Sequence, residues 1–173
     1  MTDALMSLAT AGLFAARWTT RIETEWIRAL ERKHPDLVGK LSARRDSMRD
    51  AIVDWEVPEA AWSEIARGLC MPDPGDVHVL AAALAGGVDC IVTANLRDFP
   101  ADLLAEYRIE AIDPDRFIIT QWDRYPDSAI AAFRQMRARR NRPQSGPEDF
   151  VRALERGGLP ATADRLRRAV DLI

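Results

Sequence analysis

This sequence has little cysteine and little lysine, and it has no long apolar run. Its 173 residues include two cysteines, Cys70 and Cys90, without metal-binding spacing, which argues against a disulfide framework and favours a reducing compartment, with both thiols in the core. No stretch approaches the roughly 20 apolar residues of a membrane span, and the first residues lack the basic and apolar regions of a signal peptide. We therefore predict a cytoplasmic protein with no membrane partner.

The positive charge is carried almost entirely by arginine, because only Lys33 and Lys40 are lysines. A formal net charge of −3 excludes a strongly basic chain that binds nucleic acid by bulk charge alone. The charge is uneven, however: residues 1–116 hold 13 basic and 20 acidic side chains, whereas residues 117–173 hold 11 and 7. We predict one domain over 1–116 and a helical extension over 117–173.

Apolar runs and turn signals predict that strands and helices alternate through the first domain. Short strands are expected at 13–18, 51–57, 89–93 and 109–112. Helices are expected between them, and the pattern after Asp113 is helical only. Alternation of this kind indicates an α/β fold with a parallel sheet.

Two acidic residues lie at helix positions where a structural role competes with a chemical one. Glu25 flanks the apolar stripe of its helix, where a carboxylate is costly unless it pairs with Arg21 or Arg28 or binds a cation, and spacing alone favours pairing. Asp76 stands at the entry of a helix, so capping is its simplest role.

Four further polar residues lie near Asp76 or after the next predicted strand. Asp73 suits a turn, and His78, without a second histidine or cysteine nearby, is expected at the surface. Asn95 and Asp98 follow the strand predicted at 89–93, at the carboxyl end where open α/β sheets place their ligands. For that pair, a functional role is as plausible as a structural one.

Acidic residues that are dispersed in sequence can converge on one edge of a sheet. Such a cluster repels itself unless a divalent cation neutralises it, and hard oxygen ligands would select Mg²⁺ or Mn²⁺. The site could then activate water and offset the charge of a phosphodiester under attack. Composition and spacing allow this hypothesis without requiring it.

Two long motifs resemble the central signature of PIN-domain proteins, in the branch related to VapC-type toxins. They read MPDPGDVHVLAAA at 71–83 and GGVDCIVTANLRDFP at 86–100. The stretch TRIETEWIRAL at 20–30 resembles the helix with the family's second acidic ligand, and IEAIDPDRF at 109–117 resembles its last strand. The tail is similar to the helical extension of some members, so the resemblance covers nearly the whole chain.

The resemblance implies a Mg²⁺- or Mn²⁺-dependent endoribonuclease, the toxin of a type II toxin–antitoxin system, with RNA and a cognate antitoxin as partners. It assigns catalytic and metal-ligand roles to Glu25, Asp76 and Asp98. Asn95 would be a fourth metal ligand, at a position that is acidic in some relatives. A homodimer is the usual expectation for so small a domain.

Arginines near the end of the helix predicted around 129–142 are candidates for contact with RNA or with an acidic partner. They are Arg134, Arg137, Arg139, Arg140 and Arg142. A solvated helix face is the simpler interpretation for most of them.

One part of the family pattern has no counterpart here. The family begins with a central strand that ends in an aspartate ligand, whereas this sequence starts in the helix that follows, and Asp3 aligns with a helix position. The implied fold is therefore a PIN-like three-layer fold with a parallel sheet, lacking the usual first strand. Three explanations stay open: a shortened sequence or misassigned start, a degenerate relative without catalysis, or a site that another chain completes.

Two rival functions follow from these alternatives. The first is an inactive or incomplete PIN-like protein that serves as an interaction partner and shows no metal-dependent cleavage. The second is a different metal-dependent phosphoesterase, which would act on small phosphate esters in place of RNA.

Overall fold

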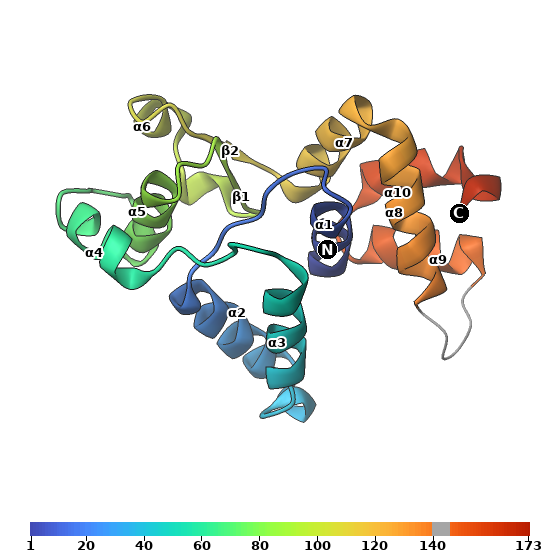
Figure 1. Ribbon diagram of the computed structural model, residues 1–173, viewed down its shortest axis with the longest axis horizontal. Coiled ribbons are helices and arrows are strands. Elements are labelled where there is room, and N and C mark those ends of the chain that lie inside the picture. The colour runs from blue at the N-terminus through green and yellow to red at the C-terminus, as the bar shows by residue number, and fades with distance from the viewer. Residues whose placement is uncertain (140–145) are drawn as a thin grey trace. The chain divides into compact units, whose positions relative to one another are not determined.

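The computed structural model describes residues 1–139 and 146–173 and shows a mostly helical α/β protein with one small parallel sheet (Figure 1). Its strands are β1 (Cys90–Val92) and β2 (Glu110–Ile112). Its α-helices are α1 (Thr2–Thr10), α2 (Thr20–Lys33), α3 (Ser42–Ala51), α4 (Glu59–Arg67), α5 (Val77–Ala85), α6 (Ala101–Ala105), α7 (Pro114–Arg124), α8 (Pro126–Ala138), α9 (Pro147–Arg156) and α10 (Pro160–Arg167). The expected α/β class, with a parallel sheet and C-terminal helices, is confirmed.

Local sequence signals set the starts of several helices. The Thr19 side chain caps α2 by accepting a hydrogen bond from the backbone N–H of Ile22 at 3.1 Å. Each of the last four helices begins with a proline in its first turn, where the missing N–H costs nothing.

The sheet is smaller than the sequence predicts. Around β1 and β2, the N–H of Glu110 bonds the carbonyl of Asp89 at 3.2 Å, and the N–H of Thr93 bonds that of Ile112 at 3.0 Å. The strands predicted at 13–18 and 51–57 are wrong, because they reduce to one parallel bridge between Trp18 and Glu56. The start of α2 and Pro58 limit this bridge on one side, and the turn at 53–54 limits it on the other, so little length is left for a ladder.

The first of two compact units, here the helical unit, comprises residues 1–15, 92–94 and 112–173. Within it, α1 packs against α8, and α10 packs against both α7 and α9 (Figure 1). One continuous apolar core joins these helices. Its members are Ala4, Leu8, Leu13, Ile118, Trp122, Ala129, Ala132, Phe133, Met136, Phe150, Val151, Leu154, Leu159, Ala163, Leu166 and Ile173.

The second unit, here the mixed unit, comprises residues 16–91 and 95–111. Its apolar side chains form two smaller clusters. One contains Met71, Leu80, Ala83, Ile91, Phe99, Leu104 and Ile109, and the other contains Val57, Trp62, Ala81 and Ala82. The prediction that both cysteines are buried is wrong, since Cys70 is exposed and Cys90 is partly exposed.

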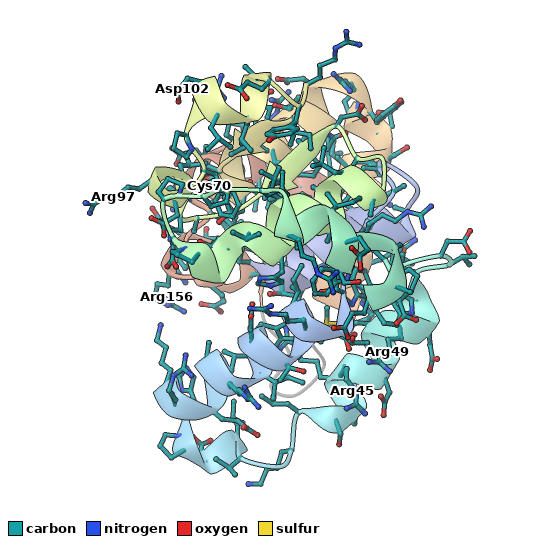
Figure 2. The ribbon with its side chains drawn as sticks, turned by 90° about the vertical axis from the view of Figure 1, so that its left-hand side faces the viewer. Arg45, Arg49, Cys70, Arg97, Asp102 and Arg156 are labelled. Carbon is teal, nitrogen blue, oxygen red and sulfur yellow. The ribbon has the colours of Figure 1, made fainter. Side chains whose placement is uncertain are left out.

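A buried carboxylate ties α2 to α3 within the mixed unit. Glu23 is 2% exposed and accepts hydrogen bonds from the Arg49 guanidinium and from Trp18 Nε1 at 2.9 Å. Arg49, which projects from α3 (Figure 2), also lies 4.8 Å from the ring centre of Trp55. Burial by itself would raise the pKa of Glu23, but the hydrogen bond and charge of Arg49 outweigh it and lower that pKa.

Within the described residues, no helix is both long and apolar enough to cross a lipid bilayer.

Candidate metal centre

A tight turn ahead of α5 places two carboxylates side by side. Asp73 begins a short 3₁₀ helix, Pro74–Asp76, and its Oδ1 accepts the backbone N–H of Gly75 at 2.7 Å. The turn expected for Asp73 is therefore confirmed. Asp76 precedes α5, but its side chain makes no capping hydrogen bond, so the predicted capping role of Asp76 is wrong. The Asp76 carboxylate is left for other contacts.

The loop after β1 contributes the third carboxylate. The chain leaves β1 and forms a 3₁₀ turn, Leu96–Asp98, in which the Asn95 amide donates a hydrogen bond to Asp98 Oδ2. Arg97, which lies beside Asp98 in the chain, points away from the ribbon (Figure 2). The loop therefore presents the amide and the carboxylate together.

Asp73, Asp76 and Asp98 form what we call the carboxylate cluster. Each contributes one oxygen atom, and these three oxygens lie within 4.8 Å of one another. Partial burial raises the pKa of Asp76, and the negative charges of Asp73, Asp98 and Glu25 raise it further, while His78 lowers it. The raised pKa of Asp76 thus reflects burial first and repulsion by the neighbouring carboxylates second, and a bound cation would offset both.

Glu25 lies outside this three-oxygen group, although its carboxylate approaches His78, a neighbour of the group. Its Oε1 lies 3.1 Å from Arg21 Nε, which confirms the pairing expected for Glu25. Its Oε2 lies 3.1 Å from Nε2 of His78. The prediction of a surface position for His78 is wrong, because the side chain is only 2% exposed.

The structure brings together Asp76, Asp98 and Asn95, whereas Glu25 lies outside that group and approaches only His78. For Asp73 the sequence indicates only a turn role. Its spacing of three residues from Asp76, with a proline and a glycine between, is the signal that both carboxylates leave the same turn. The Asp73 side chain therefore both shapes the turn and belongs to the carboxylate cluster.

The candidate arginines lie in the helical unit or outside the described residues. Arg134 Nε donates to the carbonyl of Leu172 at 3.0 Å, and Arg139 donates to Ser7 Oγ at 2.7 Å. Arg137 is partly buried, and Arg140 and Arg142 lie outside the described residues. Contact of these arginines with RNA or a partner stays a prediction.

The donor set of the cluster fits a hard divalent cation. Carboxylate and amide oxygens are the ligands that Mg²⁺ and Mn²⁺ prefer, and no thiolate or imidazole nitrogen belongs to the three-residue group. Three clustered negative charges also supply the electrostatic reason for such an ion to bind.

Comparison with models of protein families shows which family the chain belongs to. Residues 2–97, more than half of the chain, match the PIN domain family model. The chain belongs to the PIN-domain family. Residues 114–168 match a second model, described as the VapC50 C-terminal domain, so this PIN-domain chain is of the VapC type with a C-terminal extension.

A relative of this PIN-domain chain comes from Mycobacterium tuberculosis (strain ATCC 25618 / H37Rv) and is named "Putative ribonuclease VapC50". The two sequences are 38% identical over 93 residues. That stretch is 54% of this chain and 54% of the relative, so the match spans about half the length of each. No solved structure gives a significant match.

Proposed function

We propose that this chain is a divalent-cation-dependent endoribonuclease, the toxin of a toxin–antitoxin pair, with the nuclease site in residues 1–116 and a helical extension in 117–173. The observation that carries the proposal is the carboxylate cluster at the end of β1, with its raised Asp76 pKa, in a chain of the PIN-domain family. The name of the M. tuberculosis relative supports RNA as the substrate class.

Asp76, Asp98 and Asp73 would hold the cation, with the Asn95 amide fixing the orientation of Asp98 and Glu25 standing at the side of the group. Bound Mg²⁺ or Mn²⁺ would supply Lewis acidity toward a phosphoryl oxygen and neutralise negative charge. The Asp76 carboxylate is partly buried, so water screens its interaction with a cation less than it would at an exposed site. Without a cation the same charges would repel an RNA phosphate.

The test is cleavage of a defined fluorescent RNA by the full chain with Mn²⁺ or Mg²⁺. Asp76→Asn and Asp98→Asn are expected to lose activity by about a hundredfold or more, because each removes a charged ligand. Asp102→Asn is the matched control, since Asp102 is an exposed aspartate of α6 outside the cluster. Equal activity in wild type and Asp76→Asn, or none in wild type, would contradict the proposal.

Two further arms separate the rival functions. Turnover of small phosphate esters without RNA cleavage would favour a different phosphoesterase. Tight binding of an antitoxin protein with no cleavage of either substrate would favour an inactive interaction partner. For the toxin role, expression of wild type should arrest growth of host cells, and the Asp76→Asn variant should not.

The partner is proposed to be a cognate antitoxin protein, and the toxin is proposed to form a homodimer. Light scattering of the purified chain over a range of concentrations measures its molar mass and so tests for the homodimer. A monomer at every concentration would overturn the homodimer but leave the nuclease proposal intact.

A further inference from the structure

The turn between α2 and α3 gathers positive charge that the rest of the chain lacks. Residues 28–45, here called the basic tip, comprise the end of α2, the 3₁₀ turn Pro35–Leu37 and the start of α3. They hold six basic and two acidic side chains, a formal charge of +4, whereas all other residues together hold 18 and 25, a charge of −7. The basic side chains are Arg28, Arg32, Lys33, Lys40, Arg44 and Arg45.

Most of this charge is uncompensated at the surface. Five of the six basic side chains are exposed, and the sixth, Arg45, is partly exposed and pairs with Asp46 at 2.8 Å. Among the described residues, no carboxylate makes an ion pair with four of the cations, which are Arg28, Arg32, Lys33 and Lys40. These four are therefore available to an anion from outside the chain.

Backbone contacts hold the basic tip together. Glu31, one of its two carboxylates, accepts the backbone N–H of Gly39 at 2.9 Å and so fixes the turn against α2. At the other end of the two helices, the ion pair between Glu23 and Arg49 ties α2 to α3. The turn therefore lies at one end of α2 and α3, as Figure 1 shows, and the cations of all three segments gather there.

Helix stability alone does not explain where these charges lie. Arg28 and Arg32 are four residues apart on α2, a spacing at which like charges destabilise a helix. Arg44 and Arg45 stand in the first turn of α3, at the positive end of the helix dipole, where acidic residues are favoured. The dipole favours only the pair in the last turn of α2, Arg32 and Lys33. A bound anion would offset the repulsion among these cations.

The basic tip suits a phosphate backbone better than a protein surface. The centre of a protein interface is apolar and poor in lysine, but the tip contains both lysines of the chain. Val38, at 61%, is its one large apolar side chain with high exposure among the described residues. Lysine and arginine contacts to phosphates need no apolar centre and supply most of the affinity for nucleic acids.

Helix α2 connects the basic tip with the candidate metal centre, and both belong to the mixed unit. Glu25, in the first half of α2, lies beside His78, which follows the acidic turn. From Glu25 to Lys33 the helix rises by about 12 Å. A single RNA strand of a few nucleotides spans such a distance.

We propose that the basic tip binds phosphates of the RNA substrate and so holds the strand beside the carboxylate cluster. This inference rests on the proposed function, because RNA is the substrate named there. It assigns RNA contact to the hairpin of α2 and α3, in addition to the arginines that the sequence indicates near the end of α8.

The experiment measures binding of a fluorescent single-stranded RNA to the full chain by anisotropy, over a series of KCl concentrations. EDTA is present so that no metal-dependent cleavage occurs. The tip variant combines Arg32→Gln, Lys33→Gln and Lys40→Gln. The control variant makes the same change of charge at three exposed arginines of the helical unit, Arg124→Gln, Arg156→Gln and Arg168→Gln. Circular dichroism establishes that both variants are folded.

We expect the tip variant to bind RNA about tenfold more weakly in about 50 mM KCl, because three phosphate contacts are lost. The slope of log affinity against log salt should decrease by about 2, which is about 0.7 for each lost contact with a single strand. The control variant should stay within about twofold of wild type. An equal loss in both variants would be an effect of net charge alone and would overturn the role of the tip.

Steady-state cleavage with Mn²⁺ provides a second readout. The tip variant should raise KM by about tenfold and leave kcat within about twofold of wild type, because the tip holds RNA without touching the reacting phosphate. A fall in kcat at unchanged KM would contradict a binding role.

The outcomes separate this inference from the proposed function. Cleavage by wild type, with RNA binding of equal strength in the tip variant, overturns the role of the tip alone, as does wild type that binds no RNA at low salt. RNA binding that depends on the tip, in a chain that cleaves no RNA, overturns the proposed function alone. If the tip variant binds RNA normally but loses binding to labelled poly-L-glutamate, the partner of the tip is an acidic protein and the RNA assignment is wrong.

Discussion

The two units of this chain bury their side chains in different ways. The helical unit has one continuous apolar core that includes three aromatic rings, and Phe133 and Phe150 are fully buried. The mixed unit divides its apolar residues between two small clusters and places charged groups among its elements. The helical unit is stabilised mainly by apolar burial. The mixed unit is less stabilised in this way, because it places charged groups, which are costly to bury, where they are suited to binding.

Buried polar groups show the same difference. In the helical unit, Asp115 accepts the backbone N–H groups of Ala161 and Thr162 and the Thr162 hydroxyl, so it caps α10 from α7. In the mixed unit, Glu23 depends on an ion pair with Arg49, and the carboxylate cluster consists of like charges. Among the described residues, only the mixed unit contains a cluster of acidic side chains whose mutual repulsion a bound cation would reduce.

The largest effect is expected for Leu8→Ala, which tests whether α1 shares the core of the C-terminal helices. Leu8 is fully buried in the helical core, so the substitution should lower the free energy of unfolding by about 3 kcal/mol. Hydrogen exchange should accelerate in α8 and α10 as well as in α1. Leu172→Ala, at a leucine that is 52% exposed, is the control. Exchange that accelerates only in α1 would contradict a shared core.

The next effect concerns the buried ion pair of the mixed unit. Glu23→Gln should cost about 2 kcal/mol in urea unfolding at pH 7, since it removes the charge that Arg49 binds while Arg49 keeps some access to water. Because the pKa of Glu23 is lowered in the folded state, its contribution is present above 4.5 and is lost as the pH falls through the folded value.

Unfolding curves over the acid range therefore sharpen this prediction. Wild type should lose stability below pH 4.5 more steeply than Glu23→Gln, because only wild type has this carboxylate to protonate. Glu64→Gln, which alters an exposed pair with Arg67, should follow the wild-type curve. Parallel curves for wild type and Glu23→Gln would contradict the assigned role of the pair.

A smaller effect is expected in the helical unit for Asp115→Ala. The substitution leaves the first N–H groups of α10 and the Thr162 hydroxyl without their acceptor, which should cost about 1.5 kcal/mol. Hydrogen exchange at Thr162 should accelerate first. Asp171→Ala, at an exposed aspartate of the same unit, serves as the control, and equal stability of the two variants would rule out the cap.

The smallest effect has the opposite sign. Asp76→Asn should raise the stability of the cation-free protein by about 0.5 kcal/mol, because it removes a charge that is partly buried and is also repelled by neighbouring carboxylates that water partly screens. Since the pKa of Asp76 is raised in the folded state, its ionisation destabilises the fold as the pH rises through that value. Thermal unfolding with EDTA measures the gain, and added Mn²⁺ should stabilise wild type only. A loss of stability in EDTA would contradict an unfavourable, partly buried charge at Asp76.

Local patterns predicted much of the secondary structure and part of the site. One of the helices expected between residues 18 and 51 corresponds to α2, and the strands expected at 89–93 and 109–112 correspond to β1 and β2. Hydrophobic periodicity and turn-forming residues reflect interactions among near neighbours in the chain, so a short stretch of sequence is enough to recognise them. The motifs around Asp76 and Asp98 identified the family, which the comparisons confirm.

What the sequence by itself determined is therefore local: where helices begin and end, and which residues carry the chemistry of the family. Only the tertiary structure decided that α1 shares its core with α7–α10, that Asp73 joins Asp76 and Asp98, and that His78 is enclosed against Glu25. Each of these depends on burial or distance between segments far apart in the chain. Contacts of that kind are set by the packing of whole elements, which no local pattern of residues encodes.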